Sequence, residues 1–197
     1  MKIVEKLDKQ FWTEKYKNNE SGWDKGEITP PLKGYIDQLE DKSLRILIPG
    51  AGNAHEAEYL HRNGFSNVYV VDISPIPIQN LKERVPSFPE DHMLCHDFFE
   101  LDKEFDLIIE QTFFCAINPN LRTDYASKCN NLLVKGGKIV GLMFNFPLTE
   151  EGPPFGGSKE EYHTYFDPYF NIELMDEARN STVSRVGREL FVKLRKK

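Results

Sequence analysis

The sequence lacks long apolar runs and contains only three cysteines. No stretch approaches the roughly 18 uninterrupted apolar residues of a membrane-spanning helix, and the charged opening MKIVEKLDKQ is unlike a signal peptide. Cys95, Cys115 and Cys129 form no CxxC pair, and their odd number argues against a disulfide framework. We therefore expect a cytoplasmic protein with reduced, buried thiols and no membrane contact.

An excess of basic residues is also lacking. The formal net charge is −6, whereas contacts to nucleic-acid phosphates need a basic face, so we expect no nucleic-acid partner. Of the 197 residues, 40% are hydrophobic and 28% are charged, an ordinary balance for a globular domain. We expect residues 1–197 to form one domain that works as a monomer, and we assign no metal site.

Short apolar runs alternate with helical patterns from residue 44 onward. Strands are predicted at 44–48, 68–71, 92–95, 105–109 and 138–144, and helices at 54–62, 76–85 and 118–133. Lys135-Gly136-Gly137 is interpreted as the turn between the last of these helices and the strand that follows it. Such alternation is typical of βαβ units, which build a parallel sheet with helices on both faces.

The C-terminal part has a different pattern. A Pro/Gly-rich loop at 145–157 precedes a short helix at 160–166 and two successive strands at 170–175 and 189–194. Successive strands without a helix between them favour antiparallel pairing. The predicted fold class is therefore α/β: a Rossmann-like, seven-stranded, mostly parallel sheet with helices on both faces and an antiparallel C-terminal strand.

The first predicted strand is followed by Gly50-Ala51-Gly52 and then by a helix. Glycines let the backbone approach a ligand closely, and ligands of open parallel sheets bind at the carboxyl ends of the strands. Asp72 ends the second strand, about twenty residues after Gly52, where its carboxylate can accept hydrogen bonds from both hydroxyls of a ribose. The pattern predicts a nucleoside site; the alternative is a plain tight turn with a helix-capping aspartate.

The third glycine of a GxGxxG motif is missing, because His55 stands in its place. This argues against a dinucleotide, whose pyrophosphate needs that close approach. S-adenosylmethionine carries no phosphate, and acidic and aromatic residues after the third and fourth strands suit it: Asp97-Phe98 beside the adenine, then Glu110-Gln111. We therefore expect S-adenosylmethionine as the cofactor.

Aromatic residues gather within the first forty residues. Trp12, Tyr16 and Trp23 are interleaved with charges and precede Pro30-Pro31, which suit the first turn of a helix. Their π faces favour a sulfonium cation. We interpret residues 1–40 as a lid over the cofactor; for any one of these aromatics the alternative is a small separate core.

Four parts of the chain together resemble the thiopurine S-methyltransferase superfamily, which includes the plant-type thiol, thiocyanate and halide methyltransferases. They are FWTEKYKNNESGWDKGEITPPL (11–32), LIPGAGNAHE with VVDIS (47–56 and 70–74), EFDLIIEQTFFCAINPNLRTDYA (104–126) and EGPPF (151–155). The resemblance covers nearly the whole chain. It implies the class I methyltransferase fold, a small-molecule acceptor, and S-adenosylhomocysteine as the product of the methyl donor.

The same resemblance implies that the lid and the strand ends bind the cofactor. The residues assigned to this role are Trp12, Tyr16, Trp23, Gly50, Gly52, Asp72, Ile73, Asp97, Phe98 and Gln111. Gln111 departs from the family pattern, since related enzymes have Arg or Tyr there. Phe155 keeps an aromatic residue after GPP, as thiopurine-type members do, whereas plant-type members tend to have Tyr.

The acceptor side is predicted to be aromatic. Phe113, Phe114, Phe146 and Phe155 are expected to line an apolar pocket that desolvates the attacking atom. We assign no catalytic base, because an unperturbed thiol has a pKa of about 8.5 and thiocyanate and halides need no deprotonation. We expect direct in-line transfer to a thiol, sulfide, thiocyanate or halide, without a covalent intermediate on a cysteine.

Three alternatives stay open at this point. A nicotinamide-dependent oxidoreductase uses a similar sheet, and a non-catalytic module binds adenosyl ligands with the same glycines and aspartate. A methyltransferase acting on oxygen or nitrogen needs a base, for which Asp24 and Glu110 are the candidates. The missing third glycine opposes the first alternative, and the intact lid and EGPPF segment oppose the second.

Overall fold

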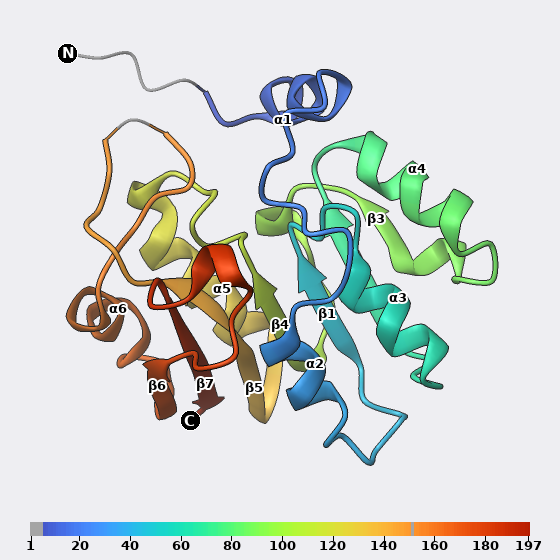
Figure 1. Ribbon diagram of the computed structural model, residues 1–197. Coiled ribbons are helices and arrows are strands. Elements are labelled where there is room, and N and C mark those ends of the chain that lie inside the picture. The colour runs from blue at the N-terminus through green and yellow to red at the C-terminus, as the bar shows by residue number, and fades with distance from the viewer. Residues whose placement is uncertain (1–5, 151) are drawn as a thin grey trace.

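Seven strands form one mixed sheet in the computed structural model, which describes residues 6–150 and 152–197 (Figure 1). The strands are β1 (Ile46–Pro49), β2 (Val68–Asp72), β3 (Met93–Cys95), β4 (Phe105–Gln111), β5 (Leu133–Phe144), β6 (Phe170–Glu177) and β7 (Glu189–Lys196). Their order is β3-β2-β1-β4-β5-β7-β6. β7 runs antiparallel to β5 and β6, and the other pairings are parallel, so the predicted fold class is confirmed.

The helices divide between the two faces of the sheet (Figure 1). They are α1 (Lys9–Lys17), α2 (Pro30–Ile36), α3 (His55–Arg62), α4 (Pro75–Arg84), α5 (Arg122–Leu132) and α6 (Lys159–Phe166), with short 3-10 turns η1 (Glu90–His92), η2 (Phe98–Glu100), η3 (Pro119–Leu121) and η4 (Val183–Arg185). Apolar residues of α2, α3 and α4 pack on one face, and those of α5 and α6 pack on the other.

Successive strand residues supply the two cores in turn, because side chains alternate across a sheet. Ile46 and Ile48 of β1 pack with Leu60 of α3, whereas Leu47 packs on the opposite face with Tyr125 of α5. β1 is buried on both sides, as expected for a parallel strand covered by two helical layers. The strand order reverses between β1 and β4, which opens a crevice at their carboxyl ends.

Two local predictions differ from the structure. Lys135-Gly136-Gly137 is not a turn, since β5 starts at Leu133 immediately after α5 and runs through these residues. Gly136 has a φ of +75°, and the ladder between β4 and β5 shifts register nearby, so the glycines form an irregularity inside the strand. Helix α1 was not predicted; Asp8 begins it by accepting a hydrogen bond from the Phe11 N–H at 3.0 Å.

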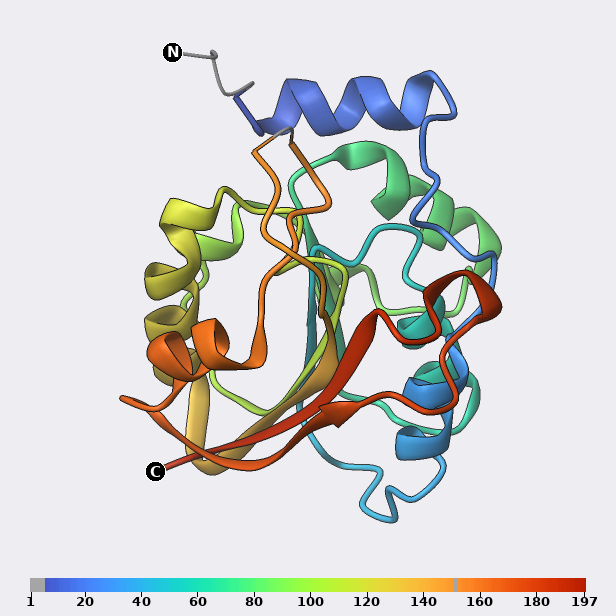
Figure 2. The same cartoon turned by 60° about the vertical axis from the view of Figure 1, so that its left-hand side comes forward.

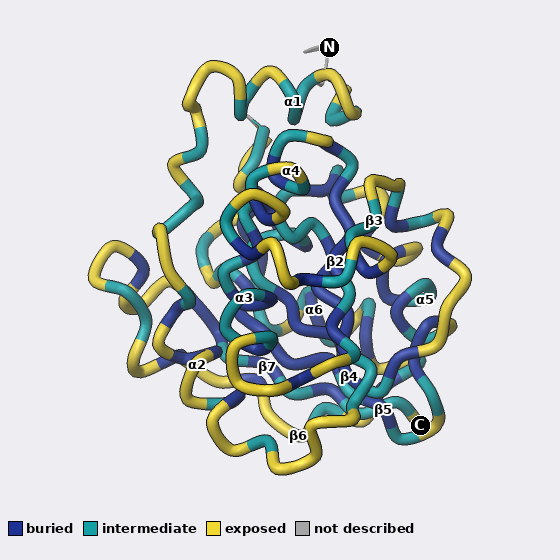
Figure 3. Tube along the Cα trace, turned by 90° about the vertical axis from the view of Figure 1, so that its right-hand side faces the viewer, coloured by how far each residue is buried: buried dark blue, intermediate teal, exposed yellow. Residues whose placement is uncertain are grey.

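The N-terminal segment crosses the carboxyl edge of the sheet (Figure 2). Helix α1 lies beside α4, and Thr13 Oγ1 donates to Ser74 Oγ at 3.2 Å. None of its residues is buried, in contrast with the strands beneath it (Figure 3). Residues 1–5 of the predicted lid and Glu151 of the EGPPF segment lie outside the described residues. Among the described residues, no helix has the length and apolar character needed to cross a membrane.

Candidate functional site

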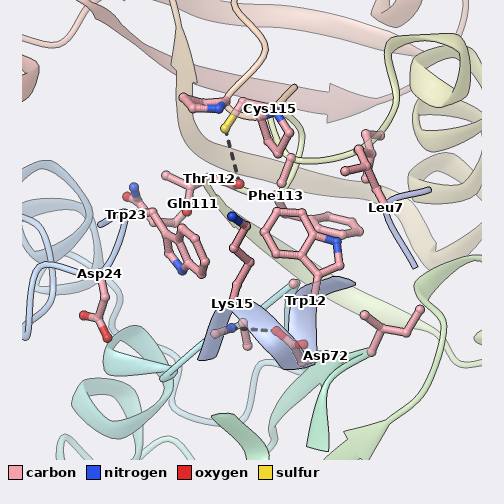
Figure 4. Close-up of a pocket in the computed structure, with 18 of the residues that line it drawn as sticks. Leu7, Trp12, Lys15, Trp23, Asp24, Asp72, Gln111, Thr112, Phe113 and Cys115 are labelled. Carbon is pink, nitrogen blue, oxygen red and sulfur yellow. Dashed lines mark hydrogen bonds between the residues drawn. The ribbon is translucent and has the colours of Figure 1, made fainter. Parts of the chain in front are cut away.

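A cavity of about 1030 Å³ lies at the carboxyl ends of β1, β2 and β4, under the N-terminal segment (Figure 4). Its volume is at the upper end of the range for small-molecule sites, roughly 300–1,000 Å³. The structure brings most of the predicted site residues together around it. Those that line it are Trp12, Tyr16, Trp23, Gly50, Gly52, Asp72, Ile73, Asp97, Phe98, Gln111, Phe113 and Phe146.

Both glycines of the turn after β1 have a left-handed backbone and a close neighbour. Gly50 has a φ of +54°, and a Cβ added there would lie 2.2 Å from the ring of Phe113. Gly52 has a φ of +52°, and its added Cβ would lie 3.0 Å from the hydroxyl of Tyr16. Gly50 therefore requires glycine for backbone conformation and for close approach, and Gly52 requires it for backbone conformation.

Asp72 is fixed beside this turn at the end of β2. One carboxylate oxygen accepts the Gly52 N–H at 2.9 Å and the other accepts the Ser74 N–H at 2.8 Å. Burial raises the pKa of Asp72 to about 6. A carboxylate has roughly four lone-pair sites, so two acceptor positions stay available on Asp72, which lines the cavity. These two positions on Asp72, at the end of β2 and beside the glycine turn, suit the two hydroxyls of a ribose.

The aromatic residues of the N-terminal segment pack against each other over the cavity. The ring centroids of Trp12 and Trp23 are 5.6 Å apart, as are those of Tyr16 and Trp23, and both pairs are edge-to-face. Burial and the charge of Asp72 raise the pKa of Tyr16, so its phenol keeps its proton. Arg185 ties the segment to the C-terminal part by donating to the Trp23 carbonyl at 2.8 Å.

A carboxylate and an imidazole also meet at the cavity wall. Asp24 Oδ1 lies 2.8 Å from His55 Nε2 and accepts the Gly26 N–H at 2.7 Å, while the Asn53 amide donates to Oδ2. The hydrogen bond to His55 is the main cause that holds the pKa of Asp24 well below its usual range. The pair joins the lid to the first turn of α3. Sequence reasoning named Asp24 only as a possible base and did not connect it to His55.

The far end of the cavity lies beside β3. Asp97 accepts the Phe99 N–H at 2.9 Å and begins a 3-10 turn, and Phe98 is almost fully buried, edge-on to Phe113 at 5.3 Å. Gln111, at the end of β4, accepts a hydrogen bond from Thr29 Oγ1 at 3.1 Å. Its amide therefore links β4 to the residue that precedes α2.

The four predicted acceptor aromatics separate into two groups. Phe113 and Phe146 line the cavity, but Phe114 and Phe155 do not. Phe114 is 1% exposed and packs on Tyr125 with a centroid distance of 5.2 Å. The left-handed conformation of Thr112, with a φ of +62°, reverses the chain after β4, so that Phe113 and Phe114 project in different directions.

Phe155 also lies outside the cavity wall where it was expected, for a different reason. It is 3% exposed, and its N–H donates to the Cys115 carbonyl at 2.7 Å. Arg122, itself fully buried, donates to the carbonyls of Phe155 and Gly156. The segment after Pro154 is thus anchored to the chain that follows β4, and it is Pro153 and Pro154 that face the cavity.

Several cavity residues carried no recognisable signal in the sequence. Arg185 and Arg188 come from the loop between β6 and β7, and the Arg188 guanidinium lies 4.8 Å from the Phe146 ring centroid. Cys115 also lines the cavity, with its sulfur 3.3 Å from the Thr112 carbonyl. Arg185 and Arg188 reach the site because the strand order brings β7 next to β5, which a linear motif does not reveal; Cys115 reaches it from the turn after β4.

The sheet order, the antiparallel β7 and the strand-end cavity define a class I S-adenosylmethionine-dependent methyltransferase fold. The solved structure of a Burkholderia thailandensis 1,6-didemethyltoxoflavin-N1-methyltransferase with bound S-adenosylhomocysteine is similar, with a TM-score of 0.70 at 14% identity over 95% of this chain and 86% of that chain. A TehB-like S-adenosylmethionine-dependent methyltransferase from Corynebacterium glutamicum gives 0.67 at 16% identity, over 96% and 98%.

Residues 7–193 match the family model for thiopurine S-methyltransferase. The chain belongs to this family, so it is an S-adenosylmethionine-dependent methyltransferase of a small molecule. It is 29% identical to a probable thiol methyltransferase 2 of Arabidopsis thaliana, over 80% of this chain and 71% of the relative. It is 26% identical to thiocyanate methyltransferase 1 of Brassica oleracea, over 95% and 85%, and 25% identical to a thiopurine S-methyltransferase of Nitrosospira multiformis, over 86% and 86%.

Proposed function

We propose that this methyltransferase transfers the methyl group to the sulfur of a small thiol or sulfide, or to thiocyanate or a halide. The observation that carries the proposal is the apolar wall on the β4–β5 side of the cavity. It consists of Phe113, Ile117, Phe144, Phe146, Pro153 and Pro154. Such a wall strips water from a soft anion, whereas a hard oxygen or nitrogen nucleophile needs a base beside it.

We propose that the cofactor lies along the opposite side, under the lid. Asp72 would bind the ribose hydroxyls, Gly50 and Gly52 would face the methionine part, and Asp97 with Phe98 would border the adenine. Trp12 and Trp23 would close over the sulfonium, and Tyr16 would do so beside the glycine turn. Ile73 and Gln111 would complete the two ends of the cofactor site. This order follows the sequence of strand ends β3, β2, β1 and β4 around the cavity.

The bound cofactor supplies a methyl group already activated on a sulfonium. What the chain contributes is the position of the acceptor and the exclusion of water. Phe113 lies directly against Gly50, and Phe146 with Arg188 forms the facing wall. Cys115 is kept out of the reaction, because burial raises the pKa of its thiol and the neutral sulfur lies 3.3 Å from the Thr112 carbonyl.

The relatives support an acceptor of this class. They are a probable thiol methyltransferase, a thiocyanate methyltransferase and a thiopurine S-methyltransferase. The similar solved folds serve other acceptors, such as the nitrogen of 1,6-didemethyltoxoflavin, so the fold by itself does not choose the acceptor.

A second function, transfer to oxygen or nitrogen, is favoured by one observation. The Asp24–His55 pair lines the cavity and has the geometry of an oriented general base. The test compares initial rates on thiocyanate and benzenethiol with rates on a catechol and an amine, in the wild type and in His55→Asn. Our proposal predicts that the wild type turns over the sulfur acceptors. In His55→Asn the rate on thiocyanate, at saturating cofactor, should stay within about threefold of the wild-type rate, since no proton leaves this acceptor. Selective turnover of the catechol or amine, abolished in His55→Asn, would instead establish the second function.

We further propose that the chain works as a monomer in the cytoplasm, with residues 1–40 as its lid. One chain provides the described residues that line the cavity. Cys95, Cys115 and Cys129 are free thiols, as reducing compartments favour, but the expectation that all three are buried is wrong, because Cys95 is exposed. Sedimentation equilibrium tests the first point: a mass of twice 22.9 kDa at micromolar concentration would contradict it.

A further inference from the structure

Glu110 is a fully buried carboxylate at the carboxyl end of β4, directly beneath the cavity. Its Oε1 accepts the backbone N–H groups of Phe113 and Phe114, both at 2.8 Å. Its Oε2 accepts the Tyr125 hydroxyl at 2.6 Å. Among the described residues no salt bridge reaches this carboxylate, so three hydrogen bonds are its visible compensation for burial.

The neighbouring strand is shaped to admit this side chain. Gly141 of β5 pairs with Glu110, and a Cβ added at Gly141 would lie 2.5 Å from the Glu110 Cβ and 2.2 Å from its carbonyl oxygen. Any other residue at position 141 would force the two strands apart or displace Glu110. The burial of the carboxylate is therefore built into the ladder rather than being a consequence of loose packing.

The turn that Glu110 holds is strained. Thr112 has a φ of +62°, a conformation that β-branched residues rarely adopt. Such a conformation persists only where the surroundings fix it. The two N–H groups that follow Thr112 both point at Glu110 Oε1, so the carboxylate fixes the turn from inside. The consequence at the surface of the cavity is the position of Phe113, whose ring lies against Gly50.

We propose that Glu110 is a positioning residue for methyl transfer: its carboxylate holds the turn after β4 in the form that places Phe113 between the glycine turn and the acceptor end of the cavity. The proposal rests on the function proposed above and deepens it. A residue beneath the cavity thereby sets the distance between the methyl donor and the methyl acceptor. Glu110 is not a base, because both of its oxygens are turned toward Phe113, Phe114 and Tyr125.

The ionised form of Glu110 performs this task best, since a carboxylate accepts three donors at once. Burial raises its pKa to about 7. The titratable groups that face it are Tyr125 and Cys129 from α5 and Cys115 from the turn. Burial raises the pKa of each of these three, so all stay neutral near pH 7. Acidification through about pH 7 therefore protonates Glu110, and one of its carboxylate oxygens changes from a hydrogen-bond acceptor to a donor.

The test uses iodide as acceptor, because iodide carries no proton across this pH range. At saturating S-adenosylmethionine, kcat/KM for iodide in the wild type should fall about tenfold from pH 8 to pH 6, as expected for a group of pKa near 7 whose ionised form is active. Glu110→Gln should show a lower kcat/KM and almost no pH dependence. A Glu110→Gln profile with the wild-type midpoint and the wild-type kcat/KM would overturn the proposal.

Tyr125→Phe is the second variant, in case Glu110→Gln does not fold. It removes a donor to the charged form, so the midpoint of the profile should move to higher pH; an unchanged midpoint contradicts the proposal. The affinity for S-adenosylhomocysteine, from tryptophan fluorescence over the same pH range, separates this proposal from the acceptor assignment. If the wild type methylates no acceptor, but its affinity already falls as the pH drops through about 7 and that of Glu110→Gln falls only through about 6, where Asp72 gains its proton, the acceptor assignment fails and the role of Glu110 stands. If both affinities follow the same pH dependence, the role of Glu110 fails.

Discussion

The ring of Phe113 lies against Gly50, with its Cδ2 atom 2.2 Å from where a Cβ of residue 50 would be. This contact joins the turn after β1 to the turn after β4, on either side of the point where the strand order reverses. Cofactor and acceptor must meet at this place if the cavity is used as proposed. A change in the conformation of either turn would therefore be felt, through the contact between Phe113 and Gly50, where the methyl group is transferred.

Gly50→Ala should impair both folding and cofactor binding. The added methyl group has to displace Phe113, and a non-glycine residue at a φ of +54° is itself strained by roughly 1–3 kcal/mol. We expect a lower melting temperature and an affinity for S-adenosylhomocysteine at least about tenfold weaker, which corresponds to about 1.4 kcal/mol. Gly34→Ala is the matched control, since Gly34 lies in α2 with open space around it; it should be neutral or slightly stabilising. Equal effects of the two substitutions would contradict this account of the turn.

Asp72→Asn should weaken the cofactor rather than the acceptor. A charge-assisted hydrogen bond contributes about 1.5–3 kcal/mol, so we expect the dissociation constant of S-adenosylhomocysteine to rise about 10- to 100-fold, measured by calorimetry. In the wild type the affinity should fall as the pH drops through about 6, because the buried carboxylate then gains a proton; in the variant this step should be missing, and only the step near pH 7 assigned to Glu110 should stay. Asp176→Asn, outside the cavity and paired with Lys159, should bind like the wild type. A wild-type affinity in Asp72→Asn would remove Asp72 from the site.

Glu110→Gln should also change how stability depends on pH. The pKa of Glu110 rises from 4.5 to about 7 on folding, which at 1.36 kcal/mol per unit amounts to about 3 kcal/mol. Because the folded state holds the proton more tightly, this stabilisation is present below about pH 4.5 and is lost as the pH rises through about 7. The free energy of unfolding, measured with urea, should therefore fall less from pH 5 to pH 8 in the variant than in the wild type. Parallel losses in the two proteins would contradict the raised pKa of Glu110 in the folded protein.

Phe146→Ala and Phe155→Ala should affect different properties. Phe146 lines the cavity beside Arg188, so its removal should raise the acceptor KM several-fold with little change in melting temperature. Phe155 is buried outside the cavity wall, and a Phe-to-Ala change in a core costs about 3–5 kcal/mol. Its main effect should be a large drop in melting temperature. The reverse assignment of the two effects would restore Phe155 to the acceptor wall.

The sequence predicted well those features that depend on local pattern. The strands that lead to Gly50 and Asp72 are apolar runs followed by a glycine turn or an acid, and both ends meet in the cavity as the parallel arrangement requires. The start of α4 was also readable at Ser74, whose hydroxyl accepts the Ile76 N–H.

Features that depend on one torsion angle or on distant packing could not be read. The direction of Phe113 and Phe114 is decided by the left-handed Thr112, and threonine gives no warning of a positive φ. Phe155 carried a family motif, but its position follows from buried Arg122, which holds its carbonyl. Helix α1 was missed because its aromatics were read as ligand contacts, although Asp8 three residues before Phe11 is a helix-start signal.

Transfer of the methyl group to sulfur is tested most directly by product analysis with S-adenosylmethionine that carries a deuterated methyl group. The purified protein is offered sulfide, benzenethiol, thiocyanate, iodide, a catechol and an amine in one mixture, and methylated products are identified by mass spectrometry. We predict label on the sulfur or halide acceptors and none on the catechol or amine, with the yield of every product at least about tenfold lower in Asp72→Asn at limiting cofactor. Label only on oxygen or nitrogen, with the sulfur and halide acceptors unchanged, would contradict the proposed function.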